Sequence, residues 1–341
     1  MTFSNWALVL IFRYNGDIAC GSTIVMGINY GLYARARRLE KRVLRLRSVR
    51  EDGAEERVEL AMDEQELGKL AKAGGFWSYA AGVAYVFCTE FQVKGLEVEN
   101  FKTTLPLKKG LSSSAAFCVL LARCFNRCYD LKLTKRGEMQ TAYEGERLTP
   151  SQCGRMDQAV AYGTVPVVMT YDGDLLKIEK AKLAQTLYIV LVDLHASKDT
   201  VKILSALQHA YPFPKTENER NLVDLLGKIN LDINKRAIQF MLDGDAKGLG
   251  LLMKEAQEEF DKKAGPMCPE HLGLDGSPVL HKVLHYEAIQ PFVYGGKGVG
   301  SQGDGTAQFL CKTEEDQRRV CEILEENLSV SCLPVTVEKN V

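Results

Sequence analysis

Three consecutive serines, Ser112, Ser113 and Ser114, stand where a segment punctuated by proline and glycine runs into a helical pattern. The residues after them place small and apolar side chains at helical spacing, which predicts a helix over 112–128. The first N–H groups of a helix have no partner within it and carry the positive end of its dipole, and Gly110 lets the backbone approach an anion closely. The junction therefore predicts a phosphate site, with an ordinary serine cap as the alternative.

Two carboxylates follow at a modest separation. Glu146 lies in the run EGER at 144–147, and Asp157 lies in the run CGRMDQ at 153–158. A hard cation such as Mg²⁺ is held by one or two carboxylates together with phosphate oxygens and water, so one acid can serve the metal and the other the chemistry. Arg155 favours the charged form of Asp157, which suits this acid to orient or deprotonate an attacking hydroxyl. Each acid taken singly is more often an exposed surface residue.

A third segment, residues 295–305, holds six glycines in eleven residues together with Lys297. It contains a formal GxGxxG, but a strand rather than a helix is expected after it, so the dinucleotide-binding interpretation fails. No P-loop pattern, GxxxxGK followed by Ser or Thr, occurs in the chain. The segment predicts a flexible loop that closes over a substrate or phosphate through its N–H groups, with a cluster of turns as the alternative.

The strands and helices that position these three segments are also indicated by the sequence. Apolar and basic residues interleave over 31–50, which predicts two half-exposed strands with solvated arginines rather than a nucleic-acid surface, because no aromatic residues alternate with them. Other patterns predict a helix over 75–90, a buried strand over 187–192 and helices over 221–260. The chain closes with an expected strand over 307–311, helix over 314–326 and strand over 329–337. A polar stretch before residue 187 places a domain boundary near residue 180.

Composition narrows the function classes. The 341 residues carry 43 Lys and Arg against 44 Asp and Glu, which argues against a mainly electrostatic grip on nucleic acid or anionic lipid. The ten cysteines form no CxxC pair, as is typical of reduced thiols in a cytoplasmic protein. The apolar run Trp6–Phe12 is far shorter than the roughly 20 residues of a membrane span, and Arg13 follows it rather than precedes it as in a signal peptide. We expect a cytoplasmic monomer or homodimer.

In this order, the three segments resemble motifs of the GHMP kinase superfamily, which includes galactokinase, homoserine kinase, mevalonate kinase and phosphomevalonate kinase. The run PLKKGLSSSAA at 106–116 is similar to the phosphate-binding motif of the superfamily. The run CGRMDQ resembles the galactokinase segment with the catalytic aspartate, and YEGER at 143–147 resembles the mevalonate kinase segment with the magnesium glutamate. Residues 296–301 correspond to the C-terminal glycine motif.

The resemblance implies a role for each matched residue. Ser114 and Glu146 would hold Mg²⁺, and Asp157, with Arg155, would act on the acceptor hydroxyl. The implied contacts to the phosphates of ATP are Lys108, Gly110, Leu111, Ser112, Ser113, Ser114, Lys297, Gly298, Gly300 and Ser301. The implied fold is α+β with two domains: an ATP-binding domain over 1–180, like ribosomal protein S5 domain 2, and a ferredoxin-like domain over 181–341.

The start of the chain departs from the resemblance. The galactokinase branch has an early motif that reads roughly Gly-Glu-His before an acid and an aromatic residue, and it contacts the sugar; this chain opens MTFSNWALVLIFRYNGD. Three explanations stay open: the natural first segment is missing, Arg13 and Asp17 take over part of its role, or the protein no longer catalyses.

The expected function is ATP-dependent phosphorylation of a hydroxyl on a small molecule, most simply a monosaccharide. The run CGRMDQ favours a sugar, whereas YEGER favours a mevalonate-type kinase. The altered opening favours a third alternative, a GHMP-fold protein that binds nucleotide or sugar without turnover.

Overall fold

The computed structural model describes residues 2–12, 21–49, 55–104, 112–151, 153–172, 175–211 and 213–341. The chain separates into two compact units. Of the described residues, the N-terminal unit contains 2–8 and those within 26–164, and the C-terminal unit contains 9–12, 21–25 and those within 165–341. Strand β2 (Ser22–Leu39) therefore runs from one unit into the other.

The units divide at Thr164, earlier in the chain than the boundary near residue 180 expected from the sequence. Strand β6 (Val167–Asp172) pairs with residues 22–25 of β2, and β7 (Leu175–Lys180) pairs with β6. The side-chain amides of Asn230 and Asn234 donate to the carbonyl of Ser22 at 2.9 and 2.7 Å. These hydrogen bonds tie the start of β2 to a helix of the C-terminal unit.

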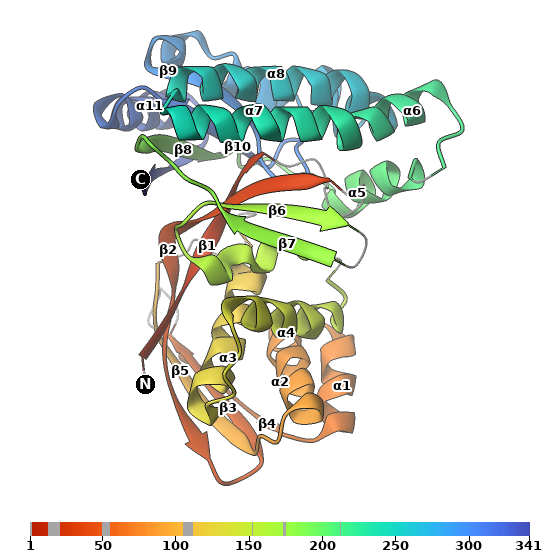
Figure 1. Cartoon of the computed structure of the whole chain (residues 1–341), viewed down its shortest axis with the longest axis vertical. Coiled ribbons are helices and arrows are strands. Elements are labelled where there is room, and N and C mark those ends of the chain that lie inside the picture. Colours follow the sequence, from red (N-terminus) through yellow and green to blue (C-terminus); the bar gives the residue numbers. More distant parts are fainter. Residues whose placement is uncertain are drawn as a thin grey trace. The chain divides into compact units, whose positions relative to one another are not determined.

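The N-terminal unit is a sheet with helices on one side (Figure 1). Along the described strands the order is β4-β3-β5-β2, with β3 and β5 parallel and the other pairs antiparallel, and β1 (Thr2–Phe12) also pairs with β2. The remaining elements are β3 (Val43–Val49), β4 (Glu55–Ala61), α1 (Glu64–Ala73), α2 (Ser78–Glu90), β5 (Gly95–Thr103), α3 (Ser113–Tyr129), α4 (Lys135–Arg147) and the 3₁₀ helix η1 (Asp157–Tyr162). The helices expected over 75–90 and 112–128 are confirmed as α2 and α3.

The basic segment forms strands with solvated arginines, as expected. Ala34 and Ala36 are buried in β2, whereas Arg35, which lies between them, and Arg37, which follows them, are exposed. Several arginines of these strands pair with glutamates of the same or a neighbouring strand: the ion pairs are Arg37–Glu97, Arg45–Glu59, Arg47–Glu99, Arg47–Glu55 and Arg57–Glu55. Since acids from neighbouring strands balance these cations, this face is a salt-bridged outer surface of the sheet.

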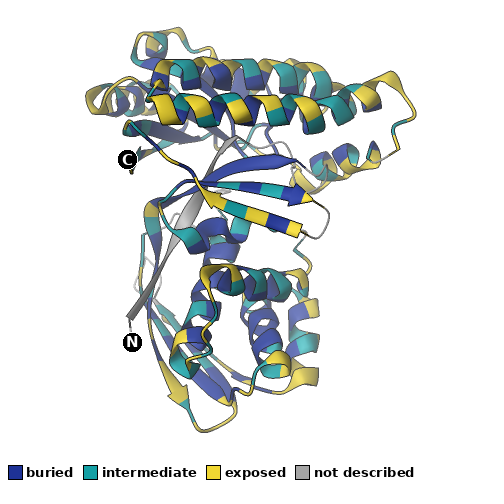
Figure 2. Cartoon of the chain, viewed as in Figure 1, coloured by how far each residue is buried: buried dark blue, intermediate teal, exposed yellow. Residues whose placement is uncertain are grey.

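The helices α2, α3 and α4 form the centre of the N-terminal unit, where α2 and α3 are largely buried (Figure 2). Helices α2 and α4 touch through glycines. A Cβ added at Gly82 would lie 2.1 Å from the carbonyl oxygen of Gly145, and one added at Gly145 would lie 2.6 Å from the backbone of Val83. Only glycine permits this approach, and it fixes the end of α4 that carries Glu146.

The C-terminal unit contains a four-stranded sheet in the order β11-β8-β10-β9, with antiparallel neighbours. Its described strands and helices are β8 (Leu187–Asp193), α5 (Thr200–His209), α6 (Glu217–Asp224), the π-helix η2 (Leu225–Ile229), α7 (Asn230–Asp243), α8 (Ala246–Ala264), η3 (Gly265–Met267), α9 (Gly273–Gly276), α10 (Pro278–Leu284), η4 (Glu287–Phe292), β9 (Val293–Gly298), β10 (Thr306–Cys311), α11 (Glu314–Asn327) and β11 (Ser331–Val337). The expected buried strand, the long helical region and the final strand–helix–strand element are confirmed.

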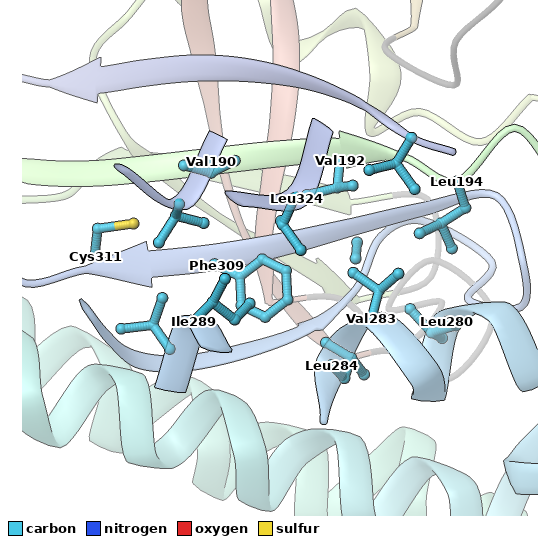
Figure 3. Packing of buried hydrophobic residues seen from close by; sticks show 14 residues of the cluster. Val190, Val192, Leu194, Leu280, Val283, Leu284, Ile289, Phe309, Cys311 and Leu324 are labelled. Carbon is cyan, nitrogen blue, oxygen red and sulfur yellow. The ribbon is translucent and has the colours of Figure 1, made fainter. Parts of the chain in front are cut away.

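A hydrophobic core lies between this sheet and the helices α10 and α11 (Figure 3). Val190 and Val192 of β8 and Phe309 of β10 point into it from the sheet, and Leu280 and Leu324 point into it from the helices. Burial of each such side chain contributes about 1.5–3 kcal/mol to folding. No helix in the described part of either unit combines the length and hydrophobicity needed to span a bilayer.

Candidate active site

The serine triplet lies at the N-terminus of α3, as the sequence predicts. Ser112 has a left-handed backbone, with φ 55° and ψ 41°, and its carbonyl accepts the first helical hydrogen bond from the N–H of Ala116 at 2.9 Å. Ala115 and Ala116 are fully buried, so the first turn packs closely into the unit. The expected phosphate contacts Lys108, Gly110 and Leu111 lie outside the described residues.

Asp157 lies beside the serines. It begins the 3₁₀ helix η1, and its Oδ1 accepts a hydrogen bond of 2.6 Å from the hydroxyl of Ser112. Two segments that are well separated in the sequence thus meet at the N-terminus of α3. A carboxylate at the positive end of a helix is electrostatically favoured.

Glu146 is the buried carboxylate of the site, with only 1% of its surface exposed. Burial raises the pKa of Glu146 to about 7, and the charge of Asp157 adds to the increase. Hydrogen bonds from the side chains of Ser114, Gln158 and Ser151 offset part of it. The site therefore combines one partly exposed acid with one whose charge is held in a low-dielectric environment.

The donor set around Glu146 suits Mg²⁺. Its carboxylate and the Ser114 hydroxyl are oxygen ligands, which Mg²⁺ prefers, and a cation would relieve the repulsion between Glu146 and Asp157. Among the described residues no group of three or more His, Cys, Asp or Glu side chains forms a complete metal cage.

Arg155 is held against helix α4. Its guanidinium carbon lies 5.4 Å from the centre of the Tyr143 ring, a cation–π arrangement. Tyr143 was identified in the sequence only as part of the segment with Glu146. The structure thus gives Arg155 a packing contact in addition to the charge effect expected from its place near Asp157.

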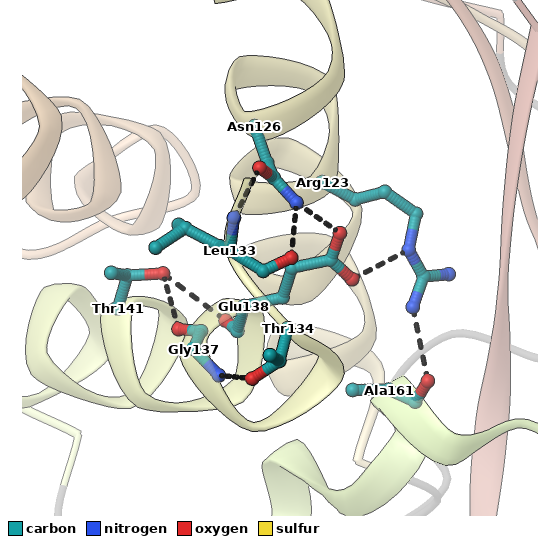
Figure 4. Close-up of polar contacts among 8 residues, drawn as sticks. All are labelled: Arg123, Asn126, Leu133, Thr134, Gly137, Glu138, Thr141 and Ala161. Carbon is teal, nitrogen blue, oxygen red and sulfur yellow. Dashed lines mark hydrogen bonds and ion pairs between the residues drawn. The ribbon is translucent and has the colours of Figure 1, made fainter. Parts of the chain in front are cut away.

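A buried polar network holds α3, α4 and η1 together (Figure 4). Arg123 of α3 donates to Glu138 of α4 at 2.9 Å and to the carbonyl of Ala161 in η1 at 3.0 Å. The amide of Asn126 donates to the other oxygen of Glu138 at 2.8 Å and to the carbonyl of Leu133 at 3.0 Å. Since η1 carries Asp157 and α4 carries Glu146, this network fixes the elements on which both acids stand.

The glycine-rich segment of the C-terminal unit differs from the expected flexible loop. Residues 293–298 form strand β9, and only the stretch up to residue 305 is a loop. A Cβ at Gly295 would lie 1.9 Å from the carbonyl oxygen of Gly250, and one at Gly296 would lie 2.5 Å from the ring of Phe309. These two glycines serve close packing of the strand against α8 and β10.

The side chain of Lys297 is buried. Only 2% of it is exposed, its Nζ donates to the carbonyl of Gly298 at 2.7 Å, and burial lowers its pKa to about 7. The N–H of Gly298 donates to the amide oxygen of Gln257. Of the other expected contacts, Gly300 has a φ of 67° and open space on its Cβ side, and Ser301 lies 3.5 Å from the hydroxyl of Thr200.

Gln158 is the site residue to which the sequence assigned no role. Its amide nitrogen donates to Oε2 of Glu146 at 2.8 Å, and the side chain is completely buried. The only sequence signal for it is its place directly after Asp157. Its contact with Glu146 depends on the packing of η1 against α4, which no local pattern predicts.

Comparison with known proteins places these features in a family. A family model of the GHMP kinases N terminal domain matches residues 78–164, which include α2, α3, α4 and η1. A galactokinase of Thermococcus kodakarensis is 27% identical over 258 residues, 65% of this chain and 71% of that protein. A galactokinase of Pyrococcus furiosus is 33% identical over 116 residues, 33% of each chain.

Solved structures agree in fold. The Lactococcus lactis galactokinase complexed with galactose has a TM-score of 0.75 and 19% identity, and the match covers 99% of this chain and 94% of that one. The Methanococcus jannaschii mevalonate kinase has a TM-score of 0.76 and 15% identity, with 100% and 98% covered. These likenesses confirm the expected two-domain α+β fold. The serine junction and the paired acids lie in or beside residues 78–164, which match the GHMP kinases N terminal domain, and the whole chain has the fold of these kinase structures.

Proposed function

We propose that the protein transfers the γ-phosphoryl group of ATP to a hydroxyl of a monosaccharide, as a galactokinase does. The observation that carries the proposal is the 2.6 Å hydrogen bond between Ser112, at the N-terminus of α3, and Asp157. It brings an anion-binding helix end and a carboxylate together, with buried Glu146 beside them. Phosphoryl transfer depends mainly on positioning and on neutralising phosphate charge, and this arrangement supplies both.

Each group has a defined task in this proposal. The hydroxyls of Ser112, Ser113 and Ser114 and N–H groups at the N-terminus of α3 would bind phosphate oxygens. Asp157 would orient the acceptor hydroxyl and take its proton as the new P–O bond forms. Mg²⁺ would be held by Ser114 and Glu146 and would neutralise charge on the phosphates.

The other expected site residues remain predictions from the sequence. Lys108, Gly110 and Leu111 keep their proposed phosphate role because they precede the serines directly. Arg155 keeps its proposed place near the acceptor. In the C-terminal unit Lys297, Gly298, Gly300 and Ser301 also keep their proposed phosphate role, and Lys297 and the N–H of Gly298 have additional partners within that unit.

The comparisons support a sugar as the acceptor. Both curated relatives described above are galactokinases, whereas the mevalonate kinase likeness is one of fold at 15% identity. A mevalonate-type kinase is therefore the weaker alternative. We further propose that the protein is cytoplasmic, has no nucleic-acid partner, and acts as a monomer or homodimer.

The test is nucleotide turnover with a panel of acceptors. ATP, Mg²⁺ and the purified protein are incubated with D-galactose, other monosaccharides or mevalonate, and ADP release and sugar phosphate are measured. We expect phosphorylation of one or more monosaccharides and none of mevalonate. Phosphorylation of mevalonate alone would replace the proposal with the mevalonate-type alternative, and ATP binding with no acceptor turned over would indicate a binding protein.

A further inference from the structure

Gln158 joins the two acids of the site from within the protein. It follows Asp157 directly in η1, but its side chain contacts Glu146. Its Nε2 donates to Oε2 of Glu146 at 2.8 Å and lies 3.7 Å from the sulfur of Cys153. Asp157 meanwhile accepts from Ser112. The 3₁₀ helix η1 thus carries Asp157 and, through the amide of Gln158, is hydrogen-bonded to Glu146.

The burial of Gln158 is costly for folding. None of its surface is exposed, and its Oε1 has no hydrogen-bond partner among the described residues. A buried polar atom without a partner costs about 1–3 kcal/mol. An apolar side chain of similar length would fill the same space without that cost. Packing alone therefore does not explain why a glutamine occupies this position. The charge-assisted hydrogen bond from its Nε2 to Glu146 does explain it.

The contact also limits the orientation of Glu146. A carboxylate at the end of a helix can rotate about its side-chain bonds, and each rotation moves both oxygens. The amide of Gln158 fixes Oε2 from one side, and the backbone contact between Gly145 and Gly82 fixes the main chain directly before Glu146. Groups that orient metal ligands in this way commonly change metal affinity by 10–100-fold when they are removed.

We propose that Gln158 is a positioning residue that holds the carboxylate of Glu146 in the orientation needed to bind a divalent cation. The inference rests on the proposed function, because Glu146 is a metal ligand only in that proposal. Gln158 itself touches neither nucleotide nor acceptor in this scheme. Its removal should weaken metal binding much more than it alters the binding of metal-free nucleotide.

The test uses Mn²⁺ as the probe. Binding of Mn²⁺ to the full chain with a non-hydrolysable ATP analogue is measured by electron paramagnetic resonance, which needs no turnover. In Gln158→Met, which keeps the side-chain length and removes the N–H donor, we expect the Mn²⁺ dissociation constant to rise roughly 10–100-fold. The KM for Mg²⁺ should rise by a similar factor, and kcat at saturating Mg²⁺ should change by less than about threefold.

The matched control is Gln140→Met. Gln140 lies on the same helix as Glu146 and its amide donates to Glu144 at 2.7 Å, so the variant removes a similar bond away from the site. We expect parental Mn²⁺ binding in this control. Should Gln158→Met fail to fold, as judged by circular dichroism, Gln158→Leu provides the same readout, because it also removes the amide donor and introduces no new metal ligand.

The outcomes separate the inference from the proposed function. A folded Gln158 variant that binds Mn²⁺ within twofold of the parent overturns the positioning role while the parent still phosphorylates sugar. An equal loss in Gln140→Met also overturns it, since the effect would then be general to α4. A parent that binds no Mn²⁺ with the nucleotide overturns the metal site and, with it, this inference.

Discussion

The hydroxyl of Ser112 donates a hydrogen bond of 2.6 Å to Asp157, so the proposed phosphate loop and the proposed catalytic acid are in direct contact. Ser112 adopts the left-handed backbone conformation, with φ 55°, immediately before α3 begins. Non-glycine residues rarely adopt it, and it costs on the order of 1 kcal/mol. The strain and the short bond occur at one residue, which indicates that the loop and the acid are positioned together.

Asp157→Asn should lower kcat by at least about 10²-fold and leave the affinity for ATP nearly unchanged. The amide keeps the shape of the side chain but cannot accept the proton of the acceptor hydroxyl, and general-base catalysis typically contributes 10²–10⁴-fold. Steady-state kinetics and nucleotide binding provide the two readouts. The control is Asp130→Asn, an exposed acid paired with Lys132 at the end of α3. Undiminished turnover would remove Asp157 from the mechanism.

Ser112→Ala should lower kcat by roughly tenfold. Asp157 loses a charge-assisted hydrogen bond worth about 1.5–3 kcal/mol, and water that hydrates the carboxylate in the variant compensates part of that loss. The sharper test is the double variant with Asp157→Asn. If the serine acts through the aspartate, the two losses will not add, and the double variant will resemble Asp157→Asn alone. Strictly additive losses would show that Ser112 contributes through phosphate contacts independently of Asp157.

The metal-free protein should lose stability as pH rises from about 4.5 to about 7. Glu146 in the folded protein has a pKa raised to about 7 from an ordinary value of 4.5, so the folded state holds a proton that the unfolded state releases. The stabilisation is complete below pH 4.5 and is lost as pH passes 7, with a magnitude on the order of 3 kcal/mol. Chemical denaturation of the parent and of Glu146→Gln at several pH values measures it. We expect the variant to lack this component of the pH dependence; identical curves would contradict the burial effect.

The elements around the site follow from local patterns, while several side-chain roles do not. The helical spacing after Ser114 predicts α3, and the alternation of alanine and arginine predicts the exposed face of β2, because both patterns are contained in one short segment. The strand that contains Lys297 does not follow from a local pattern. Glycine-rich sequence suggests a loop, but Gly295 and Gly296 are required by Gly250 and Phe309, which are remote in the sequence. The same holds for Gln158, whose burial depends on how η1 packs on α4.

Gly145→Ala should destabilise the N-terminal unit and weaken the use of Mg²⁺. An added Cβ would lie 2.6 Å from the backbone of Val83, so α2 and α4 must separate, and such overpacking typically costs 1–3 kcal/mol. Thermal unfolding and the KM for Mg²⁺ measure the two effects. Gly227→Ala is the control, since a Cβ there meets nothing within 4 Å and alanine favours a helix. Equal stability of the two variants would show that the helices can move apart freely.

Arg123→Met should lower the free energy of unfolding by about 3–5 kcal/mol, because it leaves the buried carboxylate of Glu138 without its cation. The side chain of Glu138 is only 3% exposed. In the variant, the partner that its carboxylate retains within the described network is the amide of Asn126. The loss of the bond from Arg123 to Ala161 also frees η1, so kcat should fall together with stability. Lys132→Met, which breaks an exposed ion pair with Asp130, should change stability by less than about 1 kcal/mol. Denaturant unfolding of both variants decides the matter: comparable small losses would mean that the buried network does not hold the elements of the site.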